Sequence, residues 1–527
     1  MAGAIVWISL ETLLSSSYRD VRLPADRVDR ANIGIYRFGI AAARLHSDSG
    51  KIKSADYQGS RMLTVFSGNK SKNCDGVSRR DFLSAGSLAL GSLTLPQLLA
   101  TRSALGSDHP YVRDRSVVLL YLSGGGSHIE TFDPKMDAPA EIRSVTGSVQ
   151  TTRPGVHYGG TFPQLANHAH EISIVRSFKH PIGGHEQAHV HVLTGGTDPK
   201  GDGKTGFSMG SLASRLRGAN HPQTGMPSFT LLTEPEIDGQ YRKELARVRK
   251  GSRPGVLGLP YSPFEPGAGG HAVENMTLHL PPDRFGDRRA LLSSLDLWQR
   301  RVERITTVSG TNKFNEQAVN LLAGGAAKAM DLSTEDPQLV ERYDTSDTQI
   351  GFKKFRASTL GKQMLMARRL CEAGCGFVTV HSAGWDMHAD GNNPGMQVGM
   401  EMLGRTMDKA VSTFLDDVKQ RGLSDKILLV ITGDFGRTPR VNKKGGRDHW
   451  ARLCTLAFAG GGIQPGQIIG KSSRDGGEPA TTPYNASHLM ATIMHSLFDM
   501  GELRLESQFP RELMQMLEDT PPIQELF

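Results

Sequence analysis

Histidine and acidic side chains follow several of the short apolar runs in this sequence. They form four clusters: Ser127, His128, Glu130 and Asp133; His185 and His189; Asp386 and His388; and Asp434 and His449. One Asp after a strand is usually a turn or cap residue. Because the carboxyl ends of parallel strands meet at one edge of a sheet, four such clusters predict a single site there. Carboxylate plus imidazole suits a divalent metal such as zinc, manganese, iron or calcium.

Two of these clusters have distinctive local sequences. In Trp385-Asp386-Met387-His388 both polar side chains can reach one ion, or else a hydrogen bond between them only fixes a loop. Asp434 follows the apolar run 427–432 and Gly433, which predicts a strand end; the alternative is a tight turn capped by Asp. Arg437 suits an anionic oxygen, although an Arg in a loop more often forms a surface ion pair.

The elements that must position these residues alternate between strand and helix. We expect strands over 117–122, 172–175, 227–232, 376–381, 426–432 and 453–459, and helices over 355–373, 398–418 and 485–500. Residues 197–226 are rich in Gly, Lys and Ser and predict a surface loop. The alternation predicts an α/β fold with a largely parallel central sheet flanked by helices.

The charge distribution argues against a nucleic-acid-binding protein. The net charge of +7 is concentrated at the start of the chain: residues 1–106 hold 14 Lys/Arg and 8 Asp/Glu, whereas 107–527 hold 47 and 46. The basic excess therefore belongs to the leader and not to a binding face. Four cysteines are too few for a disulfide scaffold.

Residues 78–95, SRRDFLSAGSLALGSLTL, resemble a twin-arginine export signal. We therefore expect export to the periplasm through the twin-arginine machinery, with an uncleaved signal as an anchor if no peptidase site is used. The apolar stretch is too short to span a membrane. Because Met62 would give a leader of ordinary length, we expect 1–61 to be a spurious or disordered extension and 62–106 to be the signal. Residues 107–527 then form one α/β domain with an insertion around 233–350.

Four longer segments carry a resemblance to a known family. GGGSHIETFDPK (124–135), HEQAHVHVLTG (185–195), ARRLCEAGCGFVTVHSAGWDMH (367–388) and GDFGRTPRVNKKGGRDHW (433–450) are similar to the bacterial domain-of-unknown-function family numbered 1501. That family is regarded as a relative of the alkaline phosphatase and sulfatase superfamily. The resemblance implies an alkaline-phosphatase-like α/β sandwich with a metal site at the strand ends.

The superfamily's residues carry over unevenly. Counted back from Leu193-Thr194-Gly195, the nucleophile position falls on His185, so the usual hydroxyl or thiol is missing. Gln187, Ala188 and His189 stand where sulfatases have Pro, Ser and Arg. The Asp-His-Gly motif becomes Asp434-Phe435-Gly436, which removes one metal ligand. The resemblance implies one complete metal site, formed by Asp386, His388 and His449, and an incomplete second one.

Three functions fit this sequence. The first is an exported metal-dependent hydrolase of phosphate or sulfate esters, in which a metal activates water or a histidine nucleophile and Arg437 stabilises the anion. The second is a degenerate member that binds an anionic ligand, such as a sulfated glycan, without turnover. The third is a partner in an envelope complex with a structural metal. The predicted site residues are His185 and Arg437 as catalytic groups, Asp386, His388, Asp434 and His449 as metal ligands, and Ser127, Glu130, Asp133 and His189 as further candidates.

Overall fold

The computed structural model describes residues 109–235, 237–266 and 326–527. The predicted extension 1–61, the signal 62–106 and half of the predicted insertion, 267–325, lie outside the described residues. Within the described residues, no helix is both long enough and apolar enough to cross a membrane.

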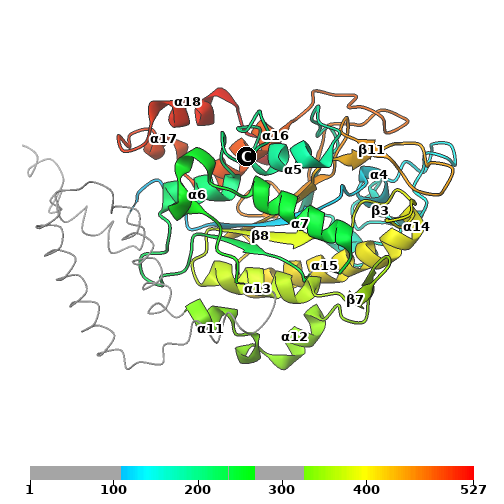
Figure 1. Cartoon of the computed structure of the whole chain (residues 1–527), viewed down its shortest axis with the longest axis horizontal. Helices are drawn as coiled ribbons and strands as arrows, with labels where there is room; N and C mark the ends of the chain where they lie inside the picture. Colours follow the sequence, from blue (N-terminus) through cyan, green and yellow to red (C-terminus); the bar gives the residue numbers. More distant parts are fainter. Residues whose placement is uncertain (1–108, 236, 267–325) are drawn as a thin grey trace, which may run out of the picture. The chain divides into compact units, whose positions relative to one another are not determined.

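A seven-stranded sheet forms the centre of the described part of the chain (Figure 1). In spatial order its strands are β13 (Ile468–Ile469), β4 (Ile172–Val175), β12 (Leu456–Gly460), β9 (Ile427–Gly433), β1 (Ser116–Leu122), β8 (Phe377–Ser382) and β5 (Phe229–Leu232). Neighbouring strands are parallel, except that β12 runs antiparallel to both β9 and β4. The predicted α/β class with a largely parallel sheet is confirmed.

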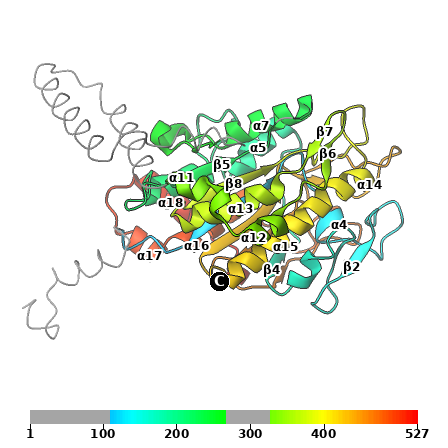
Figure 2. The same cartoon turned by 90° about the horizontal axis from the view of Figure 1, so that it is seen from below.

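Helices cover both faces of this sheet (Figure 1). On one face lie α5 (His185–Leu193), α6 (Met209–Arg217), α7 (Gly239–Gly251) and α16 (Ala486–Leu497). On the other face, α13 (Leu360–Glu372) and α15 (Arg405–Gln420) lie side by side (Figure 2). Alternate β1 residues therefore enter different cores: Val117 and Leu119 pack with α5, and Val118 and Leu120 with α13 and α15. Burial on both faces is why β1 and β9 are continuous apolar runs.

Shorter elements complete the description. The helices are α4 (His128–Thr131), α11 (Ala326–Met330), α12 (Pro337–Tyr343), α14 (Met396–Gly399), α17 (Met500–Leu503) and α18 (Arg511–Asp519), with the π-helical turn η5 (Met400–Gly404) joining α14 to α15. The 3-10 turns are η1 (Leu165–His168), η2 (Gly255–Leu257), η3 (Leu259–Tyr261), η4 (Leu332–Thr334) and η6 (Gln524–Leu526). Three antiparallel pairs join β2 (Ser148–Gln150) to β3 (His157–Gly159), β6 (Gln349–Gly351) to β7 (Phe355–Ala357), and β10 (Gly436–Arg437) to β11 (His449–Trp450).

Two expected boundaries were wrong. The loop predicted over 197–226 contains helix α6, whose residues Met209, Leu212 and Leu216 are buried at helical spacing within a glycine-rich stretch. The helix predicted over 355–373 begins only at Leu360, because Phe355–Ala357 pairs as strand β7 with β6. In both places tertiary packing overrides local composition.

A buried ion-pair network ties α13 to α15 on the face away from α5. Arg368 is 1% exposed, and its guanidinium donates to Asp417 Oδ2 at 2.9 Å, Glu335 Oε2 at 2.8 Å and Glu372 Oε2 at 2.5 Å. Asp417 also accepts from the Tyr343 hydroxyl at 3.0 Å. Removing one member of such a network leaves a buried charge without a partner, and an unpaired buried charge destabilises the folded state.

We therefore expect Arg368→Met to lower the free energy of unfolding by about 3–5 kcal/mol, because the buried Asp417 would keep only the partly exposed Arg421 as a cation. The matched control is Arg342→Met: Arg342 pairs with Asp416 at 3.3 Å, and both side chains are more than 40% exposed. That variant should lose less than about 1 kcal/mol. Urea unfolding of both variants measures the difference, and equal losses would contradict the assignment.

Candidate metal centre

The centre lies where three parallel strands end together. Leu122 of β1 is level with Ser382 of β8 and Gly433 of β9, so the segments that follow these strands leave the sheet at one edge. Gly124 lets two of them approach closely: its φ is +104°, and a Cβ atom there would lie 2.5 Å from the Asp386 backbone nitrogen. This contact brings the Asp386 loop against the turn that follows β1, and the Gly124 N–H of the same turn donates to Asp434 Oδ1.

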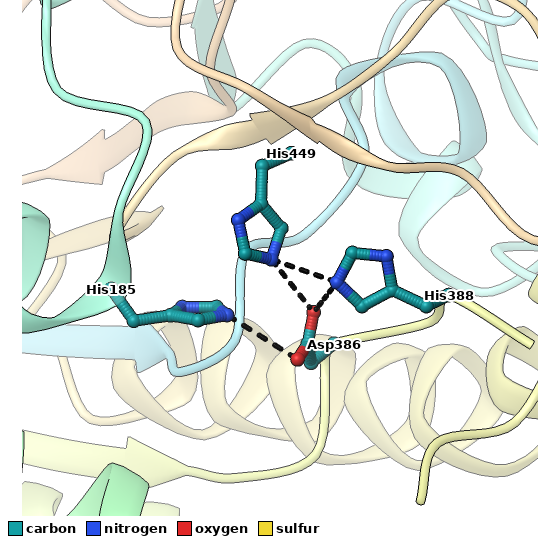
Figure 3. Close-up of side chains that lie close together, drawn as sticks. All are labelled: His185, Asp386, His388 and His449. Atoms are coloured by element: carbon teal, nitrogen blue, oxygen red, sulfur yellow. Dashed lines mark hydrogen bonds and ion pairs between the residues drawn. The ribbon is translucent and has the colours of Figure 1, made fainter. Parts of the chain in front are cut away.

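Four side chains from distant parts of the chain converge above this edge: His185, Asp386, His388 and His449 (Figure 3). His388 Nε2 lies 2.7 Å from His449 Nε2 and 2.9 Å from Asp386 Oδ1. His449 Nε2 lies 3.4 Å from the same oxygen, and His185 Nε2 lies 3.3 Å from Asp386 Oδ2. One nitrogen of each histidine therefore points at the Asp386 carboxylate.

The opposite ring nitrogens show the protonation of two of these histidines. His449 Nδ1 lies 3.1 Å from the Gly183 carbonyl, and His388 Nδ1 lies 3.3 Å from the Asp448 carboxylate. Both partners are acceptors, so each Nδ1 carries the proton and, in a neutral ring, each Nε2 carries a lone pair. Arg437 Nη1, a donor, also lies 3.4 Å from His388 Nε2. The two Nε2 atoms lie 2.7 Å apart beside the Asp386 carboxylate, so a cation belongs between them, either a proton on one of the two rings or a metal ion.

A divalent metal fits this donor set. Around a tetrahedral ion with bonds of about 2.0–2.2 Å, neighbouring ligand atoms are roughly 3.3–3.6 Å apart, close to the separations from Asp386 to His185 and His449. The Nδ1 contacts match the oxygen partners that orient metal-binding histidines. His185 Nε2 is buried and has no hydrogen-bond partner among the described residues, although Asp386 lies near it.

The electrostatics show how strongly these groups depend on one another. Burial alone raises the pKa of the Asp386 carboxyl, but the three surrounding histidines and the Arg437 guanidinium outweigh it and hold that pKa far below its usual range. Burial alone lowers the pKa of His185, but Asp386 and Asp434 outweigh it and raise the pKa to about 9. Without a metal, His185 is therefore protonated at neutral pH and pairs with both Asp386 and Asp434.

Asp434 contacts His185 at Nδ1, the ring nitrogen opposite the one that faces Asp386. It is fully buried, and its Oδ1 accepts from the Gly124 N–H at 3.0 Å while its Oδ2 lies 2.5 Å from His185 Nδ1. His189 Nδ1 lies 3.3 Å from the same Oδ2. Burial raises the pKa of Asp434, but His189 and His185 outweigh it and lower the pKa to about 2. Asp434 therefore fixes the orientation of His185, and His185, His189 and Asp434 form a second group with metal-ligand spacing.

Sequence reasoning missed two buried residues beside Asp434. Ser123 Oγ donates to His189 Nε2 at 2.8 Å, since His189 Nδ1 donates to the His185 carbonyl. His180 Nε2 donates to the Asp434 carbonyl at 2.7 Å. The signal for Ser123 was its place directly after β1. His180 had no comparable signal beyond lying in a histidine-rich stretch.

All N–H groups of the Arg437 guanidinium make contacts inside the protein. It donates to the carbonyls of Gly124, Gly125 and Arg447 and to Asp386 Oδ1, the last at 2.5 Å. Together with the contact to His388 Nε2, these use all five N–H directions, and the side chain is 0% exposed. Arg437, predicted to stabilise an anionic oxygen, thus holds Asp386 and three carbonyls in place.

The remaining candidates lie apart from the four convergent side chains. Ser127 caps α4 by accepting from the Glu130 N–H. Glu130 forms a completely buried pair with Arg447 at 2.8 Å and also accepts from Ser144 Oγ at 2.7 Å. Asp133 contacts Ser472 and Lys135. Phe435, in contrast, packs against the rings of His185 and His449 with centroid separations of 4.7 and 4.5 Å, forming an apolar wall of the centre.

Comparisons with known proteins give both structural and sequence matches. A protein in the alkaline phosphatase superfamily from Vibrio parahaemolyticus is 10% identical with a TM-score of 0.35, covering 78% of this chain and 77% of its own. The sulfatase PsFucS1 from Pseudoalteromonas sp. is 12% identical with a TM-score of 0.32, covering 79% and 71%. The alkaline phosphatase from the Antarctic bacterium TAB5 is 12% identical with a TM-score of 0.31, covering 73% and 98%.

The comparison with curated proteins found no match. The family model described as "Protein of unknown function (DUF1501)" matches residues 114–508, which confirms the membership expected from the motifs. The matched range contains every residue of the centre, from Ser123 to His449. This chain therefore belongs to the DUF1501 family.

Proposed function

We propose that this protein is a divalent-metal-dependent hydrolase of phosphate or sulfate esters. Asp386, His388 and His449 would hold the metal, and His185 would face it across the Asp386 carboxylate. The observation that carries the proposal is that the Nε2 atoms of His388 and His449 lie 2.7 Å apart beside the Asp386 carboxylate. The ester class is supported by the motif correspondence with phosphatases and sulfatases.

When bound, the metal would supply Lewis acidity to polarise the ester and activate water. The residues around it have separate tasks. Arg437 donates a hydrogen bond to the Asp386 carboxylate and holds it in place. The Gly183 carbonyl orients the His449 ring, and Asp448 orients the His388 ring. Phe435 keeps water from one side of the histidine rings.

His185 is the group best placed to move a proton or attack the ester. Its Nδ1 is held by Asp434 at 2.5 Å, which leaves Nε2 directed at the centre. A cation bound at Asp386 disfavours the imidazolium form, because like charges lower the pKa of a histidine. Metal binding would thus convert His185 from an acid into a base or nucleophile at neutral pH.

One observation favours a second function, anion binding without turnover. The nucleophile position carries His185 and no hydroxyl, and the neighbouring Ser123 hydroxyl is completely buried. A protein with this arrangement can hold a metal and an anionic group and still lack an efficient attacking atom. The two functions share the metal centre and differ only in catalysis.

We expect the purified protein to contain about one divalent metal ion per chain. His388→Ala and His449→Ala should each lose most of it, because each removes one of three ligands. Plasma mass spectrometry measures metal content, and a panel of aryl phosphate and sulfate esters measures turnover. Retained metal and turnover in His185→Ala would remove His185 as nucleophile or base.

The matched control for these variants is His495→Ala. His495 lies on α16, and its Nδ1 donates to the Ala491 carbonyl, so its loss should leave metal content unchanged. Metal in the wild type without turnover of any ester would support the second function. A wild type free of metal after expression in metal-supplemented medium would contradict both functions.

Metal affinity should depend on pH through His185. The pKa of His185 is raised to about 9, so below that pH the metal-free protein carries a proton that metal binding must displace. Apparent affinity should therefore fall as pH falls from 9 to 7, by about tenfold per unit for one displaced proton. Titration with a competing chelator at several pH values measures the slope. In His185→Gln the slope should be much reduced, and an unchanged slope would contradict this account.

A further inference from the structure

A cavity of about 390 Å³ opens beside His388. It is lined by His388, Asp390, Asn442, Lys443, Lys444 and Asp448. His388 belongs both to this cavity and to the four convergent side chains, so the cavity adjoins the centre through the ring of this one residue.

The loop that carries the two lysines is fastened to the metal-site loop. Asn442 Nδ2 donates to the His388 carbonyl at 3.0 Å and to Asp448 Oδ1 at 3.2 Å. Asn442 Oδ1 accepts from the backbone N–H groups of Lys444 and Gly446, each at 3.0 Å. Gly446 packs so closely on this loop that a Cβ atom there would lie 2.2 Å from the His388 carbonyl carbon. The position of the lysine backbone is therefore set by His388.

The acidic groups of the cavity are held in place by hydrogen bonds, whereas the lysine side chains have no ion-pair partner among the described residues. Asp390 Oδ1 accepts from the N–H groups of Asn392 and Asn393 at 2.7 and 2.9 Å, and Asp448 Oδ1 faces His388 Nδ1. Lys443 and Lys444 are exposed, and their ammonium groups form no ion pair within the described ranges. Since Arg437 is buried and uses all its donors internally, these lysines are the cations that the cavity offers to a bound anion.

We propose that this cavity binds a second anionic group of the substrate through Lys443 and Lys444. The preferred substrates are then polyanionic esters, in which one phosphate or sulfate group lies at the metal centre and another lies in the cavity. This inference rests on the proposed function, because it takes the centre to bind the first anionic group. Lys443 and Lys444 would determine specificity without contacting the ester bond that is broken.

The test compares two probes that differ by one phosphate group, glucose 1-phosphate and glucose 1,6-bisphosphate. Calorimetric titration of the metal-loaded full chain at low ionic strength should show about tenfold tighter binding of the bisphosphate, as expected for an added charge-assisted contact at a partly exposed site. In the double variant Lys443→Gln, Lys444→Gln the advantage should fall to about twofold or less, while glucose 1-phosphate binding and metal content stay unchanged. Raising the salt concentration should reduce the wild-type advantage.

The matched control is Lys362→Gln, an exposed lysine on α13 that does not line the cavity, which should keep the wild-type ratio. Equal wild-type affinity for both probes would overturn the subsite and leave the proposed function standing. A double variant that keeps the tenfold ratio would also overturn it. If neither probe bound the metal-loaded protein, the phosphate-ester form of the proposed function would fail, and the subsite with it.

Discussion

The centre depends on one electrostatic constraint: a carboxylate and two imidazole lone pairs cannot share so small a volume without a cation. Asp386 lies at the middle of this constraint, with His388 and His449 on one of its oxygens and His185 on the other. In the absence of a metal, the Asp386 and Asp434 carboxylates raise the pKa of His185 to about 9, and the protonated ring balances part of their charge. A divalent cation would satisfy the constraint and be held by His388 Nε2, His449 Nε2 and Asp386 Oδ1.

Much of the surrounding structure keeps these atoms in place. Two buried arginines follow β9: Arg437 fastens Asp386 to the turn after β1, and Arg447 pairs with Glu130 behind it. Both arginines are 0% exposed, so neither can contact a ligand. Each one joins loop segments that are not paired with each other as strands. Asp434, held by the Gly124 N–H, does the same for His185. The strand-end edge of the sheet is therefore held together by charge-assisted hydrogen bonds as well as by apolar packing.

The sequence alone predicts the sheet edge well, because β1, β8 and β9 are uninterrupted apolar runs whose ends are marked by glycine or polar residues. It also predicts that the side chains after those ends converge, and the structure brings His185, Asp386, His388 and His449 together. It does not distinguish Glu130, which follows a strand end equally well but points into a buried pair with Arg447. Nor does local pattern show that β12 runs antiparallel or that Ser123 contacts His189, since both depend on partners distant in sequence.

The most direct test of the central claim is a crystal structure of the purified protein with anomalous diffraction recorded at the metal absorption edges. The account predicts an anomalous peak bounded by His388 Nε2, His449 Nε2 and Asp386 Oδ1, at about 2.0–2.2 Å from each. The two histidine nitrogens should then lie further apart than the 2.7 Å seen here. No anomalous peak from crystals grown with zinc or manganese, with the two nitrogens still at hydrogen-bonding distance, would contradict it.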